Sequence, residues 1–240
     1  MIINRDPIIH KEVHIKNTNI KLNWLRASVL GANDGIVSVS AVIVGVAGAT
    51  NTLHFIMTAG IAALVAGALS MGVGEYVSVS TQRDTEQALL EKERRELIEV
   101  PEQELEELII IYQSKGLSRR TAETVANELT DRDAFAAHVD AELGIDPNAL
   151  TDPWHAAYAS AISFVVGALI PVVAVAVAPS SNRILLTFIS VLIALVFTGS
   201  LSAHAGGANK LRATVRVVCG GIIAMVITFG IGKLFGVIGI

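Results

Sequence analysis

The chain has 240 residues, of which 52% are hydrophobic and only 17% charged, and its mean hydropathy is +0.57. Long uncharged runs at this density exclude an ordinary water-soluble domain and predict a membrane protein. The net charge of −4 is unevenly spread, because residues 83–142 hold 16 acidic and 8 basic side chains. This acidic segment argues against nucleic acid as a partner and favours cations.

Residues 1–26 form a polar arm with five Lys or Arg side chains, a pattern typical of the cytosolic side of a membrane. Residues 27–53 contain one charged side chain, that of Asp34. They are long enough to cross a bilayer. We therefore expect a cytosolic N-terminal arm followed by the first membrane span.

The second apolar run begins at Phe55 and has Glu75 as its only charged residue up to position 82. Beyond it the chain becomes densely charged, yet no proline occurs before Pro101. One helix over 55–98, roughly 66 Å long, would therefore leave the bilayer and carry carboxylates into water. Its small residues, such as Ala59, Ala63 and Gly67, would allow another helix to approach closely in lipid.

Residues 83–152 are predicted to form an acidic, helical, cytosolic metal-binding segment, called here the module. Its first helix is the extension of the second span. Pro101 suits the first position of a second helix. Ser118 and Thr130 suit the caps of a third and a fourth helix, the last of which would run to Leu143.

Residues 153–240 are predicted to hold three more spans, at 156–182, 184–203 and about 214–234, with Pro171 kinking the first of them. Basic residues cluster at the predicted inner turn after the fourth span. The fold class is therefore all-α: a polytopic membrane protein with five transmembrane helices and the module between spans two and three.

Two acidic residues occur within predicted spans. Asp34 and Glu75 each lie about six residues to the cytosolic side of the centre of their uncharged window, which places both roughly 9–10 Å from the midplane. Met71 lies one turn deeper on the Glu75 face. We interpret the three as a transport pathway of hard oxygens and one soft thioether. The alternative is an Asp that caps the first helix and a Glu that reaches the lipid headgroups.

The module contains three pairs of possible ligands at helical spacing. They are Glu93 with Glu96, Glu104 with Glu107, and His138 with Glu142. Carboxylates with an occasional imidazole suit Fe²⁺ or Mn²⁺, whereas a structural zinc site would need cysteine, which the module lacks. The alternative is that these acids are only solvated.

Two motifs resemble the vacuolar iron transporter family. One is the run GANDGIVS at 31–38 and the other is AGALSMGVGEYVS at 66–78; Gln82-Arg83-Asp84 and Glu142-Leu143-Gly144-Ile145 add to the likeness. The resemblance covers the chain from about Trp24 to its C-terminus. It implies proteins that move Fe²⁺, often Mn²⁺ as well, out of the cytosol in exchange for protons, as five-span dimers with a cytosolic metal-binding domain.

By that resemblance, Asp34 and Met71 match the family's pathway residues, and five module glutamates match its ligands: Glu93, Glu96, Glu104, Glu107 and Glu142. Two positions that are acidic in some members hold Ala27 and Ala63 here, which weakens the case for proton coupling, although Glu75 could substitute. A methionine pair of some members is replaced by His138 and Val139.

The sequence thus predicts a divalent-metal transporter, not an enzyme, that forms a homodimer, lies in the bilayer and needs no cofactor besides the Fe²⁺ or Mn²⁺ it moves or binds. A membrane-anchored protein that only sequesters metal is the alternative, and a Ca²⁺/proton exchanger is a weaker one. Since no organellar signal is visible, the cell membrane is the expected location.

Overall fold

The structure is a computed structural model that describes residues 18–147 and 150–238; most of the predicted N-terminal arm lies outside them. The described residues form helices and no strand. In chain order these are α1 (Thr18–Ala49), α2 (Leu53–Glu99), α3 (Pro101–Ser114), α4 (Arg119–His138), a π-helical turn η1 (Val139–Leu143), α5 (Pro153–Val177), α6 (Arg183–Ala205) and α7 (Lys210–Ile238).

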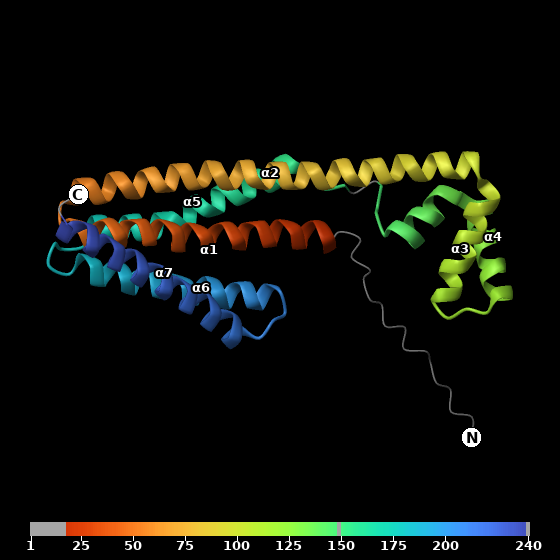
Figure 1. Cartoon of the computed structure of the whole chain (residues 1–240). Helices are drawn as coiled ribbons and strands as arrows, with labels where there is room; N and C mark the ends of the chain where they lie inside the picture. The colour runs from red at the N-terminus through yellow and green to blue at the C-terminus, as the bar shows by residue number, and fades with distance from the viewer. Residues whose placement is uncertain (1–17, 148–149, 239–240) are drawn as a thin grey trace, which may run out of the picture.

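Five of these helices are long and apolar enough to cross a membrane: the Ser28–Ala49 part of α1, together with α2, α5, α6 and α7. They lie side by side as one bundle (Figure 1). The all-α, five-span architecture expected from the sequence is therefore confirmed. The observed ends of the spans differ from the predicted ones by a few residues. The span expected at 156–182 is α5, which begins at Pro153 and ends at Val177. The Asp152 side chain caps its start by accepting a hydrogen bond from the Trp154 amide.

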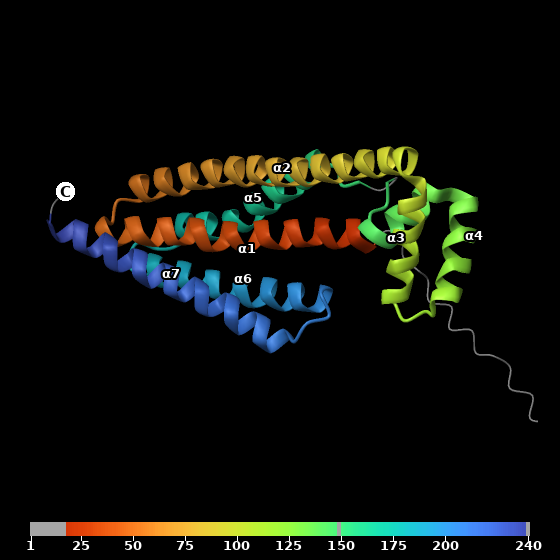
Figure 2. The ribbon, with the colours of Figure 1, turned by 45° about the vertical axis from the view of Figure 1, so that its right-hand side comes forward.

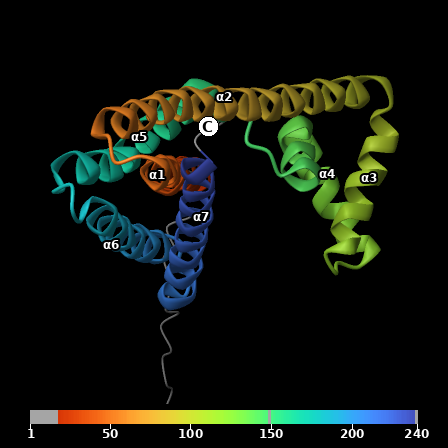
Figure 3. The same cartoon turned by 60° about the vertical axis from the view of Figure 1, so that its left-hand side comes forward.

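Helix α1 lies at the centre of the bundle, with the other membrane helices around it (Figure 3). Its Val39 and Ile43 belong to one buried cluster with Phe164 of α5. Its Ile36 and Val44 belong to a second cluster, formed with α6 and α7. Because α1 buries side chains in two cores, it fixes the positions of all four neighbours.

Helices α1 and α5 cross at very short range through glycines. A Cβ atom on Gly35 would collide with the backbone oxygen of Phe164, and one on Gly167 would collide with the backbone of Ala32. Close approach through small residues is the main way in which helices gain packing energy in lipid. This contact holds Asp34 beside α5.

Helix α2 extends far beyond the bundle, to Glu99, and carries the module at its end (Figures 1 and 2). Its 47 residues span roughly 70 Å. Helices α3 and α4 follow at that end and pack against each other through a small core of Leu108, Ile109, Ala122 and Ala126. The long continuous helix predicted from the sequence is confirmed.

The last part of the module differs from the prediction. Ser118 caps α4 as expected, since its side chain accepts a hydrogen bond from the Thr121 amide. Thr130 does not start a new helix. The backbone instead leaves helical geometry at Asp133, whose carboxylate accepts a hydrogen bond from the Ala136 amide and so caps the segment that follows.

Candidate metal sites

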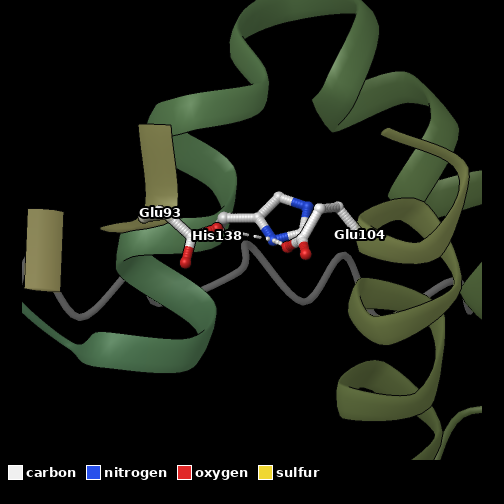
Figure 4. Close-up of side chains that lie close together, drawn as sticks. All are labelled: Glu93, Glu104 and His138. Carbon is white, nitrogen blue, oxygen red and sulfur yellow. Dashed lines mark ion pairs between the residues drawn. The ribbon is translucent and has the colours of Figure 1, made fainter. Parts of the chain in front are cut away.

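Three side chains from three different elements meet inside the module (Figure 4). Glu93 lies on the extension of α2, Glu104 on α3 and His138 at the end of α4. One ligand atom of each lies within 4.8 Å of the others. Oxygen ligands sit about 2.3–2.6 Å from an ion as large as Ca²⁺, so ligands that share one ion are up to about 5 Å apart. The spacing therefore allows a single bound cation.

The turn between α2 and α3 brings the two glutamates together. Helix α2 stops at Val100, whose amide donates to Glu96 O, and Pro101 starts α3 at once. Proline suits that position because it lacks an N–H group that would go unpaired. This abrupt turn, visible in Figure 1, leaves Glu93, two turns before the corner, near Glu104, one turn after it.

His138, at the end of α4, is the third member of the group and lies close to both glutamates. Its Nδ1 lies 3.1 Å from Glu93 Oε1 and 3.6 Å from Glu104 Oε2. These separations are short, yet the 3.1 Å contact lacks hydrogen-bond geometry: neither ring nitrogen of His138, nor Glu93 Oε1, has a hydrogen-bond partner within the described structure. All three side chains are at most 7% exposed. Buried polar atoms without partners are costly, and one cation would satisfy His138 Nδ1 and Glu93 Oε1 together.

The ionisation of the group also suits a cation. Burial, and after it the neighbouring carboxylates of Glu142 and Glu104, together raise the pKa of Glu93 from 4.5 to about 7. Burial likewise raises the pKa of Glu104. Burial lowers the pKa of His138, which keeps the imidazole neutral. A bound cation would relieve the repulsion between these carboxylates and could be coordinated by the neutral imidazole.

The remaining predicted ligands surround this group without joining it. Glu142 lies near enough to Glu93 to raise its pKa, and is itself exposed. Glu96 and Glu107 lie outside the three-residue group, but their charges raise the pKa of Glu104. His138 was paired with Glu142 on sequence spacing, whereas its close neighbours are Glu93 and Glu104.

A second candidate site lies within the membrane bundle. Asp34 and Met71 line one cavity of about 290 Å³ between α1, α2 and α5. Gly67 leaves room for the ring of Phe164, which forms part of the wall. The cavity also exposes the hydroxyl-bearing residues Ser38 and Ser70. Sequence reasoning assigned no role to Ser38 or Phe164; the i+4 spacing of Ser38 from Asp34 was a signal for the first, and no local pattern signals the second.

Glu75 is placed differently from the other two pathway candidates. It is half-buried on α2, one turn nearer the module than Met71, and it does not line the cavity that Asp34 and Met71 share. The structure therefore brings together two of the three predicted pathway residues.

Membrane helices around a carboxylate-lined cavity, joined to an acidic helical module with a buried ligand cluster, define a polytopic membrane protein of the ion-handling class. The chain belongs to the VIT family, whose family model matches residues 25–233. The resemblance read from the two span motifs is thereby confirmed.

Named relatives agree over nearly the whole chain. The chain is 45% identical to a protein named "Vacuolar iron transporter" of Acanthamoeba castellanii, over 97% of this chain and 86% of that one. It is 36% identical to "VIT-like transporter 1b" of Glycine max, over 90% and 78%. It is 32% identical to "Vacuolar iron transporter homolog 2" of Arabidopsis thaliana, over 99% and 97%. Names that refer to a vacuole give no support to the expected cell-membrane location.

Proposed function

We propose that this protein transports a divalent transition metal, Fe²⁺ foremost, across the membrane that it spans and out of the cytosol. The observation that carries the proposal is the buried group of Glu93, Glu104 and His138, which each offer a ligand atom within 4.8 Å of the other two. The names of the relatives, which describe iron transporters, supply the choice of iron.

The module's proposed role is to collect the ion on the cytosolic side. Two carboxylates and one imidazole suit Fe²⁺ and Mn²⁺ better than they suit Ca²⁺, which prefers shells made only of oxygen. The outer acids, Glu96, Glu107 and Glu142, would attract the ion and supply further oxygens.

The proposed path through the bilayer uses the cavity of Asp34 and Met71. Asp34 would draw the ion from water, and the thioether of Met71 would favour a transition metal over Mg²⁺ or Ca²⁺. Asp34 is exposed on the single chain. We therefore assign the other wall of the path to a second copy, in a homodimer. Glu75 is the proposed proton carrier for exchange against the metal.

Transport by the purified protein in liposomes tests this function, with Fe²⁺, Mn²⁺, Zn²⁺ and Ca²⁺ supplied in parallel and internal pH recorded. We expect Fe²⁺ uptake to be accompanied by a rise in internal pH, because protons leave the liposome as the metal enters. Asp34→Ala should lose uptake, and Met71→Leu should show a narrower preference for transition metals. Ser190→Ala, a hydroxyl deletion on α6 away from the cavity, is the matched control.

The same assay separates transport from sequestration. A sequestering protein would bind metal through the module and move none, so wild type and Asp34→Ala would give equal, background uptake. Uptake by a correctly folded Asp34→Ala protein at the wild-type rate would instead exclude the proposed path.

A further inference from the structure

The end of the bundle opposite the module, called here the far face, contains a cavity of about 570 Å³ that the proposed metal path does not use. It lies where α1 ends and α6 begins, against α7. This volume falls within the usual range for small-molecule sites. The cavity has no acidic residue in its lining but does contain the guanidinium of Arg183.

Within residues 18–147 and 150–238, Arg183 forms no ion pair. Its Nη1 donates to the backbone oxygen of Asn51, and its buried Nε has no hydrogen-bond partner in the described part of the chain. No Asp or Glu occurs in the sequence between positions 35 and 74, or anywhere after Asp152. The two stretches supply every membrane-crossing part on the far face. An anion that satisfies Arg183 must therefore come from outside these helices.

A second cation, Lys233, does not line the cavity but lies against one of its lining residues. Lys233 sits over the ring of Phe229, with its Nζ 5.7 Å from the ring centroid, and Phe229 lines the cavity. The first turn of α6 adds uncapped amide groups, since the Asn182 side chain makes no capping hydrogen bond. A metal cation would be repelled here, which separates this site from the transport path.

The lining is divided between polar and apolar parts. The polar lining residues include Asn51 and Ser181, which are exposed, whereas the apolar ones include Met225, which is buried, and Phe188 and Phe229, which are half-buried. Leu185 and Val226 line the cavity and are also exposed on the bundle surface. The apolar lining therefore continues onto the bundle surface, which would face the hydrocarbon of the bilayer.

We propose that this cavity binds an anionic phospholipid of the far leaflet, with its phosphate against Arg183 and its acyl chain along Phe188, Met225 and Phe229. Guanidinium is the side chain best suited to phosphate, because its donors match two phosphate oxygens at once. A free phosphate ion would share the Arg183 contact, but it would leave the apolar lining residues and their continuation on the bundle surface unused.

Thermal unfolding of the purified protein in a neutral maltoside detergent tests the proposal. The probes are dihexanoyl phosphatidylglycerol, inorganic phosphate, and dihexanoylglycerol, which lacks the phosphate. We expect a saturable rise in the unfolding midpoint with the phospholipid only. Arg183→Gln should weaken this binding by about tenfold or more, since charged hydrogen bonds are lost. Arg216→Gln, which removes an arginine from the opposite end of α7, should leave it unchanged.

Arg183→Lys is the second variant, because it keeps the charge if Arg183→Gln does not fold, and it should retain part of the binding. Equal stabilisation by inorganic phosphate would overturn the proposal in favour of a free-anion site. Equal stabilisation by dihexanoylglycerol would overturn it in favour of a merely apolar cavity. No stabilisation by any probe would remove the site. None of these outcomes bears on metal transport, which is measured separately.

Discussion

Glu93 is stabilised in its protonated form in the metal-free module, but it must be deprotonated to bind a metal ion. Its pKa is raised from 4.5 to about 7 by burial and by neighbouring carboxylates. The folded, metal-free module therefore binds this proton between pH 4.5 and 7, where the unfolded chain has lost it. That contribution to stability is complete at low pH and is lost as pH rises through 7. A metal ion binds only the deprotonated carboxylate, so in the metal-bound module the deprotonated form of Glu93 is the more stable one.

Metal affinity should consequently fall on acidification. Below pH 7 each metal ion must displace the Glu93 proton, so affinity should drop about tenfold per pH unit between pH 7 and 6. Titration of the full-length protein with Mn²⁺ by calorimetry at pH 8, 7 and 6 measures this. His138, with its lowered pKa, adds little above pH 6.5 because it is already neutral. Constant affinity across this range would show that Glu93 is not a ligand.

A matched pair of glutamates on α3 tests which acids bind metal. Glu104→Gln should weaken binding by about tenfold or more, because it removes one oxygen charge from the buried group. Glu106→Gln should have little effect, because Glu106 is held by Arg119 through contacts of 2.7 and 2.8 Å instead. The same calorimetric titration compares them. Equal affinities for the two variants would mean that the three-residue group does not hold the ion.

At the scale of the element, the crossing of α1 and α5 depends on the absence of side chains. A methyl group at Gly35 meets the Phe164 backbone rather than a flexible side chain, so the helices would have to separate. Gly35→Ala should therefore lower the free energy of unfolding by about 1–3 kcal/mol.

The control for this substitution is Gly220→Ala on α7. A Cβ atom there meets nothing within 4 Å. Alanine should be neutral or should stabilise the helix by up to about 1 kcal/mol. Unfolding in mixed detergent, followed by circular dichroism, measures both variants. A Gly35→Ala protein as stable as wild type would show that α1 and α5 do not approach this closely.

At the scale of the whole molecule, α2 and α5 place the module and the turn at 178–182 at opposite ends of the bundle (Figure 1). Ser114 and Ser181 are both exposed. With Cys219 replaced by serine, cysteines introduced singly at these two positions should react with an impermeant maleimide from opposite sides of the membrane. The basic residues near the predicted inner turn assign Ser114 to the cytosol. Labelling of both from one side would overturn this topology.

The sequence by itself determined the architecture. Five uncharged runs can avoid unpaired backbone groups in lipid only as helices, so their number and order follow from length and hydropathy. The α2 extension and the Pro101 corner are equally local, because helix propensity and proline geometry act over a few residues. Asp34 and Met71 were recognisable because a charge or a thioether stands out in an apolar run and a motif surrounds it.

Only the tertiary structure decided which of the candidate ligands meet. Glu93, Glu104 and His138 lie on three elements, and their contact depends on the Pro101 corner, the break at Asp133 and the π-helical turn together. Helical spacing paired His138 with Glu142, because spacing reports faces of one helix and not the packing of several. The far-face cavity and the unpartnered Nε of Arg183 were equally invisible, since both arise where three helix ends that are distant in sequence come together.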